Sequence, residues 1–308
     1  MNTYLPEGRL LNTQENRAAL ASLAGIKDAM FHGTVLEGRA LLCDKEHNLH
    51  VELGTMRGII PRNECAMGIE DGSVRDIAII SRVNKPVMFK VLELETDLSG
   101  TSYAVLSRRA VQEEYLREYI GKLSHGDVID VTVTHLENFG AFCDVGAGIS
   151  ALLPIDGISV SRIPHPNVRF AVNQQIRAVV KDIDESLRLT LSHKELLGTW
   201  EENAALFSIG ETVPGIVRSV EKYGIFIELT ANLAGLAEYA DGIYVGQHTS
   251  VYIKNIIPEK MKIKLIIVDS FSAEYPLPPV RYFMDINHID SFLYSPEHCD
   301  KRIESVFE

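Results

Sequence analysis

The chain has few cysteines and few aromatic residues for its 308 residues. Aromatic residues make up only 7% of it, with a single tryptophan, so aromatic side chains that recur at fixed spacing are informative. The cysteines show no CxxC spacing, which argues against a disulfide framework and against a zinc site. We therefore expect reduced thiols in a cytoplasmic protein. The cysteines are Cys43, Cys65, Cys143 and Cys299.

Long hydrophobic runs are also missing. No stretch reaches the roughly 18–20 apolar residues that span a bilayer, and the first ten residues lack the basic segment and apolar core of a secretory signal. We therefore expect no membrane association. With 46% hydrophobic and 23% charged residues, the composition is that of a globular protein. At roughly 100–200 residues per domain, the length predicts about two domains, or more if they are small.

Signatures of enzymes are absent or out of context. The sequence contains no GxxxxGKS/T, HExxH or GxSxG pattern. Residues 146–151 match the dinucleotide pattern GxGxxA, but the helix that this motif needs is interrupted by Pro154. The acidic run 182–185 is typical of a solvated turn, and the histidines show no ligand spacing. We predict a protein that is not an enzyme and has no cofactor, no metal and no small-molecule substrate.

The charge balance is acidic, with a net charge of -12. Such a balance repels nucleic acid. However, the segments 31–109, 124–194 and 209–270 carry net charges of only -1, -2 and -1. Much of the excess lies in the connector 195–208 and in the tail from residue 271 onwards. Each of the three segments is therefore close to neutral and can still present a basic face.

An internal repeat organises the chain. The segments that begin at Ser124 and Ser208 match at six positions that are all 84 residues apart. Their second halves match at an offset of 73–74, so the later copy is shorter by about ten residues, lost from a predicted loop. A fainter copy begins at Gly33, in which His47 and His50 stand roughly where the aromatic residues stand later. The six pairs are Gly126/Gly210, Val133/Val217, Phe139/Tyr223, Gly140/Gly224, Phe142/Phe226 and Leu152/Leu236.

Each repeat is typical of short β-strands. Residues 128–134 are rich in β-branched side chains, and residues 187–191 alternate between apolar and polar. Five such strands in about 70 residues favour a small barrel over an open sheet. We predict a mainly all-β protein of three tandem five-stranded OB-fold barrels joined by short helices. The expected divisions are an extension 1–28, a degenerate first barrel 29–108, a connector 109–123, a second barrel 124–193, a connector 194–207, a third barrel 208–270 and an arm 271–308.

Helical spacing marks the connectors. Val111, Tyr115 and Ile120 recur on one face of the first, and Ser107 is a candidate N-cap. Leu196, Leu197, Trp200 and Ala204 share a face of the second. Near the N-terminus, Thr13 is a candidate cap of a short helix. The tail is rich in proline and aromatic residues, and we expect an arm that packs on the last barrel.

The pattern aromatic-Gly-x-aromatic occurs in both later repeats, as Phe139/Phe142 and Tyr223/Phe226. A regular strand points residues three apart to opposite faces, but a glycine between them permits a bulge or tight bend that brings both rings to one side. Paired rings on a small barrel can stack unpaired bases, at roughly 1–3 kcal/mol per base. The alternative is that one ring of each pair is part of the barrel core.

Basic residues follow on later strands, where they can track a nucleic-acid backbone. For each of them singly, a solvated surface charge is the competing interpretation. They are Arg177, Lys181 and Arg188 in the middle repeat, and Lys254, Lys262 and Lys264 in the last.

At these residues the chain resembles the RNA-binding repeat named after bacterial ribosomal protein S-one. The similarity covers about residues 29–270, and three repeats correspond to a short form. The resemblance implies an OB-type barrel, binding of single-stranded RNA, notably messenger RNA, and association with the small ribosomal subunit. It places the family's aromatic contacts on the two aromatic pairs, and its acidic and basic contacts on Asp184 and Arg188, with Lys262 as the basic partner in the last repeat.

Several positions depart from the family. Where the family often has a histidine after the third strand, the chain has Pro61, Pro154 and Glu238. The first repeat lacks the aromatic pair, and we expect docking to the ribosome or another protein from it rather than RNA contact. We predict a cytoplasmic monomer that binds single-stranded RNA in translation. The rival hypotheses are an adaptor that docks on the ribosome or a nuclease complex without binding RNA, and a regulatory module of a separate enzyme.

Overall fold

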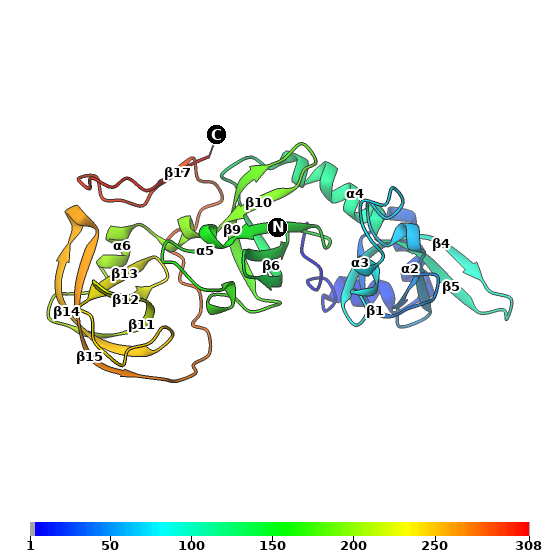
Figure 1. The fold of residues 1–308 in the computed structure, drawn as a ribbon. Helices are drawn as coiled ribbons and strands as arrows, with labels where there is room; N and C mark the ends of the chain where they lie inside the picture. The colour runs from blue at the N-terminus through cyan, green and yellow to red at the C-terminus, as the bar shows by residue number, and fades with distance from the viewer. Residues whose placement is uncertain (1–3, 308) are drawn as a thin grey trace. The chain divides into compact units, whose positions relative to one another are not determined.

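A computed structural model describes residues 4–307 of the chain (Figure 1). It contains three closed barrels of five strands each, which confirms the predicted fold class. The first barrel consists of β1 (Leu36–Cys43), β2 (Leu49–Glu52), β3 (Arg57–Ile60), β4 (Pro86–Thr96) and β5 (Ser102–Ser107). The second consists of β6 (Val128–Glu137), β7 (Gly140–Asp144), β8 (Ser150–Pro154), β9 (Gln175–Ile183) and β10 (Leu189–Ser192). The third consists of β11 (Thr212–Glu221), β12 (Gly224–Thr230), β13 (Leu233–Ala237), β14 (His248–Ile257) and β15 (Lys262–Phe271).

All three barrels share one strand order. The first three strands pair in succession, the fifth lies beside the third, and the fourth closes the barrel between the fifth and the first. The third and fifth strands run parallel in each barrel. The fourth strand runs antiparallel to both the first and the fifth. Alternation along each strand sends one side chain inward and the next outward. In β11 and β12, for example, Val217, Ile225 and Ile227 are fully buried inside the third barrel.

The strand pairing supports the repeat found in the sequence. Leu152 pairs with Thr190 in the second barrel, and Leu236 pairs with Lys264 in the third. These two pairs are offset by 84 residues in the third strand and by 74 in the fifth, as the alignment of the repeats requires. The difference arises in the segment between the third and fourth strands. There the second barrel has α5 (Ile155–Ile158) and a loop with η3 (Pro166–Val168), and the third has a shorter loop.

The chain divides into two compact units, which we describe separately. The first unit contains the residues up to Leu123 together with Asp144–Ser150. The second contains Ser124–Cys143 and the residues from Ala151 onwards. The limits of the seven divisions predicted above stay a prediction.

In the first unit, short helices and an N-terminal segment pack on the barrel. The helices are α1 (Gln14–Leu20), α2 (Leu23–His32), η1 (Arg62–Glu64), α3 (Ile77–Ile80), α4 (Arg109–Glu118) and η2 (Ile120–Lys122). Thr13 caps α1 as expected, because its side chain accepts a hydrogen bond from the Asn16 amide. The strands β4 and β5 continue past the barrel as a long hairpin, drawn in cyan in Figure 1.

Buried carboxylates tie the N-terminal segment to this unit. The Glu7 carboxylate receives hydrogen bonds from Arg108 and Arg82, with the shortest at 2.6 Å. Glu37 accepts backbone N–H groups of the same segment, including those of Leu10 at 2.7 Å and Leu11 at 2.6 Å. Burial raises the pKa of Glu37 to about 7. The N-terminal segment is therefore held by charged and backbone groups as well as by apolar packing.

The connector after the first barrel contains α4 and then the short η2 rather than one continuous helix, but the face predicted for it is buried. Val111, Tyr115 and Ile120 are all buried. Ser107 accepts a hydrogen bond from the Ala110 amide at 2.9 Å and thereby satisfies a donor of the first turn of α4.

The connector after the second barrel is interrupted. It contains η4 (Lys194–Leu197) and α6 (Trp200–Ala204) rather than one continuous helix. The break falls at Gly198, whose φ is +81°, and α6 then begins with a capping box between Thr199 and Glu202. The face predicted from Leu196, Leu197, Trp200 and Ala204 is buried.

The C-terminal arm contacts both barrels of the second unit rather than the last barrel alone. Its Asn287 carbonyl accepts the Val128 amide at 2.8 Å, and its Ile289 amide donates to Gly126 at 2.9 Å, both in the second barrel. Further along, β16 (Ser291–Leu293) and β17 (Glu304–Val306) pair as a two-stranded sheet.

Candidate nucleic-acid interface

The first aromatic pair lies at a hairpin of the middle barrel. Asn138 and Phe139 form the two-residue turn between β6 and β7, and Phe142 follows within β7. The rings of Phe139 and Phe142 are edge to face, with centroids 5.9 Å apart and an interplanar angle of 86°. Phe139 is 55% exposed and Phe142 is half-buried. Neither ring therefore belongs to the barrel core.

The second pair repeats this arrangement in the third barrel. Tyr223 occupies the turn between β11 and β12 and is 71% exposed, and Phe226 is half-buried in β12. Their centroids are 6.1 Å apart with an interplanar angle of 85°. Because the same geometry occurs in two barrels, neither pair is explained by side-chain packing that is peculiar to one barrel.

The glycine of the motif is required by the adjacent strand. A Cβ atom on Gly140 would lie 2.4 Å from the carbonyl oxygen of Leu153, and one on Gly224 would lie 2.5 Å from that of Ala237. No real Cβ approaches a backbone oxygen so closely. The tight bend predicted from the sequence is therefore a two-residue turn followed by a strand that only glycine can begin at this distance.

Register places a lysine on the same face as the second pair. Phe226 pairs with Leu236, and Leu236 pairs with Lys264, so three neighbouring strands carry these side chains in one row. Residues paired in this way point to the same side of a sheet. Lys264 is exposed and its neighbours Ile263 and Leu265 are buried. In the middle barrel, the equivalent position beside Leu152 is Thr190.

The other predicted cations occupy matching places in the two barrels. Arg188 and Lys262 are exposed and lie two residues before Thr190 and Lys264. Lys181 and Lys254 are also exposed, and each falls where the fourth strand bulges against the fifth. Lys181 and Lys254 therefore lie on the fourth strands, Lys262 begins the fifth strand of its barrel, and Arg188 directly precedes the fifth strand of the middle barrel.

Asp184 stabilises the turn that presents Arg188. Its carboxylate accepts the backbone amides of Ser186 at 2.8 Å and Arg188 at 2.9 Å. Its own amide donates to the Arg188 carbonyl at 3.1 Å. The corresponding residue of the third barrel is Ile257, which has no side-chain oxygen to do this, and the turn is replaced there by η5 (Pro258–Lys260).

Arg177 is held by the arm. Its guanidinium contacts the Met284 carbonyl at 3.3 Å and the Asp285 carboxylate at 3.1 Å, and it also donates to the Ile286 carbonyl. Its amide donates to the Tyr282 hydroxyl. Of the six basic residues predicted to follow a nucleic-acid backbone, Arg177 is therefore the least available, because its terminal nitrogens already have protein partners. The sequence did not reveal this, since the arm is more than one hundred residues away.

The first barrel has no aromatic pair. His50 occupies the place of Phe226, because it pairs with Ile59, which in turn pairs with Val105. The row that consists of Phe226, Leu236 and Lys264 in the third barrel thus consists of His50, Ile59 and Val105 in the first. His50 also contacts the Asp44 carboxylate at 3.1 Å. This row therefore contains no lysine.

The described residues include no group of three or more histidine, cysteine or acidic side chains that could hold a metal ion. Within the same part of the chain, no helix is long and apolar enough to cross a membrane. The four cysteines are free.

Tandem five-stranded barrels with this strand order define a protein built from OB-type repeats, two of which display a paired aromatic platform. A comparison with protein families matches residues 122–194 to the S1 RNA binding domain. The middle barrel is thus the part of the chain that matches the S1 RNA binding domain. Over most of its length the chain is similar to bacterial ribosomal protein bS1.

Curated relatives extend this similarity over most of the chain. The small ribosomal subunit protein bS1 homolog of Bacillus cereus is 30% identical over 235 residues, which are 73% of this chain and 57% of the relative. The bS1 protein of Rickettsia conorii is 27% identical over 241 residues, which are 72% of this chain and 40% of the relative. The chain spans about half the length of these curated relatives.

Among solved structures, a multidomain protein with nucleic acid binding domains from Streptococcus pneumoniae is 13% identical. The match covers 83% of this chain and 76% of that one, with a TM-score of 0.25.

Proposed function

We propose that this chain binds single-stranded RNA, including messenger RNA, in the translation machinery. The observation that carries the proposal is the same exposed aromatic pair at the same hairpin of two barrels, one of which matches the S1 RNA binding domain. Unpaired bases stack on Phe139/Phe142 and on Tyr223/Phe226. Because every base has a flat apolar face, this binding tolerates many sequences.

Electrostatic contacts come from the cations that follow the rings. Lys181, Arg188, Lys254 and Lys262 track phosphates, with Asp184 acting by holding the turn that presents Arg188. Arg177 adds to this only as far as the arm releases it. Each barrel has few such contacts, so we expect weak binding by one barrel and a gain when both bind one strand.

The relatives named as small ribosomal subunit proteins support association of this chain with that subunit. We propose that it acts there as a non-catalytic cytoplasmic monomer. The first barrel supports a second role, docking to protein, because its row of His50, Ile59 and Val105 lacks both rings and lysine. Leu41 and Leu42 on β1 are also about half exposed, at 48% and 47%.

Fluorescence anisotropy of a labelled, unstructured RNA of about 20 nucleotides tests the proposal. At roughly 1–3 kcal/mol per stacked base, replacing both Phe139 and Phe142 by alanine should weaken binding at least about fivefold. Raising the salt concentration should weaken binding by the wild-type protein. The matched control is Phe31→Ala, because Phe31 is an 84% exposed ring on α2, outside either pair.

Equal losses in the double variant and the control would contradict the stacking role. Absence of RNA binding by the folded wild-type chain would reject the proposal and favour the docking protein. A partner that is retained after RNase treatment would support the same alternative.

A further inference from the structure

The row that contains each aromatic ring also includes a residue of the first strand of the barrel. In the third barrel, Ser219 on β11 pairs with Phe226. The middle hairpin has the same two-residue turn, and the residues of the two hairpins correspond at an offset of 84. His135 on β6 therefore lies opposite Phe142. Residues paired in this way point to the same side of a sheet, with Cβ atoms about 4.5–5.5 Å apart. The His135 side chain thus lies beside the middle aromatic platform.

The ring of His135 is available to a ligand. It is exposed, and it forms no hydrogen bond or ion pair within residues 4–307. The neighbouring Thr134 uses its hydroxyl to donate to the Phe142 carbonyl at 3.1 Å, which ties β6 to β7 at this position. An imidazole can donate or accept a hydrogen bond when it is neutral, and it gains a second donor and a positive charge when it is protonated.

Few charged groups lie near His135 on the neighbouring strands. Glu137, two residues further along β6, is exposed. Asp144, at the end of β7, is buried, and burial raises its pKa to about 7. Residues 171–174, which form backbone hydrogen bonds with β6 from its other side, contain no charged side chain, and neither does β8.

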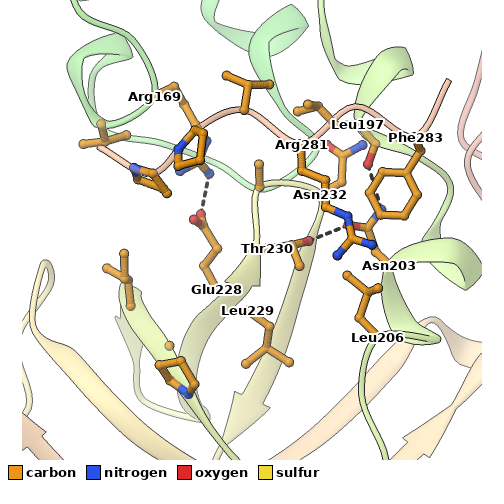
Figure 2. Close-up of a pocket in the computed structure, with 18 of the residues that line it drawn as sticks. Arg169, Leu197, Asn203, Leu206, Glu228, Leu229, Thr230, Asn232, Arg281 and Phe283 are labelled. Carbon is orange, nitrogen blue, oxygen red and sulfur yellow. Dashed lines mark hydrogen bonds and ion pairs between the residues drawn. The ribbon is translucent and has the colours of Figure 1, made fainter. Parts of the chain in front are cut away.

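The short helix η3 also packs on β6, and a basic or titratable residue lies at each of its ends. Arg169 lines the pocket of about 400 Å³ drawn in Figure 2, where it donates to the Glu228 carboxylate and is thereby engaged. Nδ1 of His165 accepts a backbone amide of its own loop at 3.1 Å. Asp144 and His165 are therefore the other groups near His135 that can change charge close to neutral pH, and they require their own controls.

The two platforms differ in where the row carries a group that can be positively charged. The third barrel has Lys264 on its fifth strand and Ser219 on its first. The middle barrel has Thr190 on its fifth strand and His135 on its first. A lysine stays charged across the physiological range, whereas a histidine changes charge between about pH 5 and about pH 8. The charge of the middle row can therefore depend on pH in a way that the charge of the third row cannot.

We propose that His135 is a further RNA-contact residue of the middle barrel, and that its protonation makes this barrel bind single-stranded RNA more tightly in acidic solution. This inference rests on the RNA binding proposed above. A nucleotide whose base stacks on Phe142 brings its phosphate within reach of the neighbouring imidazole. The neutral ring can form a hydrogen bond with the nucleotide, and the protonated ring adds a charge-assisted hydrogen bond to the phosphate. The third barrel, with Ser219 at this position, lacks the response.

The test isolates the middle barrel in the full chain by replacing Tyr223 and Phe226 with alanine. The ligand is a labelled RNA made of uridines only, because uracil has no basic ring nitrogen that would titrate in this range. As the pH is lowered from about 8 to about 5.5, anisotropy should show a gain in affinity of about two- to fivefold. The plot of log affinity against log salt should become steeper by about 0.7, because one more cation contacts a phosphate.

His135→Gln in the same background removes the group that takes up the proton and keeps a side chain that forms hydrogen bonds. It should retain binding at the higher pH and lose most of the gain at the lower pH, while any contribution from Asp144 remains. The matched control, His165→Gln, should keep the gain. A pH profile that His135→Gln leaves unchanged, or that His165→Gln abolishes, would overturn the proposal.

A converse variant transfers the response to the third barrel. A chain in which Phe139 and Phe142 are replaced by alanine binds through the third barrel, and its affinity should change little over this pH range. Adding Ser219→His should introduce the gain in acidic solution, because the position is the same in both hairpins. Circular dichroism at both pH values shows whether each variant is folded. A folded Ser219→His chain whose affinity stays independent of pH would contradict the role assigned to this position.

The outcomes also separate this inference from the proposed function. If no chain binds the RNA at either pH, RNA binding is rejected and the role of His135 is rejected with it. If RNA binds and the Phe139/Phe142 replacement weakens it, but His135→Gln leaves the pH profile unchanged, only the role of His135 is rejected.

Discussion

Lys264 and Arg177 show how neighbours decide what a single basic residue can do. Both lie in β-strands of repeats that resemble an RNA-binding family. Lys264 stands in one row with Leu236 and Phe226 and is free to reach a strand stacked on that ring. Arg177 is engaged by backbone carbonyls and a carboxylate of the arm. Whether a basic side chain can contact a phosphate therefore depends on strand register and on contacts with the arm, and not on its charge alone.

Replacing Lys264 by alanine should weaken binding of single-stranded RNA to the third barrel. One lost phosphate contact should make the plot of log affinity against log salt shallower by about 0.7. Anisotropy titrations at several salt concentrations measure this slope. Lys260→Ala, an exposed lysine in η5 outside the row, is the control. An unchanged slope for Lys264→Ala would remove this residue from the interface.

At the scale of elements, the hairpin that carries each aromatic pair depends on the close packing of one glycine against the backbone of the neighbouring strand. The turn residue Phe139 and the strand residue Phe142 can share a side because β7 begins at a glycine pressed against β8. The same hairpin recurs between β11 and β12 with Gly224. The bend, the close strand pairing and the ring geometry are therefore one structural unit.

Gly140→Ala should disturb this unit, because its new Cβ would lie 2.4 Å from the Leu153 carbonyl oxygen and the hairpin must move. We expect a loss of about 1–3 kcal/mol in the free energy of unfolding, and weaker RNA binding by the folded variant. Urea unfolding and anisotropy report the two effects. Gly242→Ala is the control, because Gly242 has a φ of +83° but open space around it. Losses of equal size in both variants would show that backbone strain, and not the contact with β8, is responsible.

At the scale of the whole chain, charged groups join segments that are distant in sequence. Glu7 pairs with Arg108, and its amide donates to Asp144 at 2.8 Å. Glu37 receives the backbone of residues 8–11. Burial raises the pKa of Glu37 to about 7, and burial with the nearby Glu7 charge raises that of Asp144 to about 7. The stability of the chain should therefore depend on pH near neutrality.

The direction in which stability changes with pH follows from the number of protons bound by the folded and unfolded chains. Between the ordinary carboxyl pKa of 4.5 and about 7, Glu37 holds a proton in the folded chain that the unfolded chain has lost. The free energy of unfolding should therefore fall as the pH rises through this window and level off above it. Glu7 has a lowered pKa, so its contribution is lost only in more acidic solution. Urea unfolding at a series of pH values between about 5 and about 8 measures the effect.

Glu37→Gln should reduce this dependence, because that side chain no longer titrates, and Asp144 should supply the part that remains. Glu15→Gln, an exposed residue of α1, should leave it unchanged. A wild-type stability that rises with pH across this window would contradict the expected sign.

Much of this protein follows from its sequence alone. Two of the barrels follow from a repeat whose six matches, including both aromatic positions, are 84 residues apart, and the first barrel follows from the fainter copy that begins at Gly33. Local signals also sufficed for the cap at Thr13 and for the buried faces of both connectors, because capping and helical periodicity act over a few residues. The aromatic pair is such a signal, since a turn and its glycine are adjacent in sequence.

Only the tertiary structure decided which surface residues meet. Lys264 joins the row of Phe226 through two strand pairings, and Arg177 of the middle barrel is engaged by the C-terminal arm. Gly198 divides the second connector, and His193 and Arg169 line a pocket with the distant Phe283. These relations depend on long-range register and packing, for which no short segment carries a signal. The repeat and the local turns can therefore be predicted from the sequence. Whether a ligand can reach a given charged side chain depends on the distant segments that fold against it.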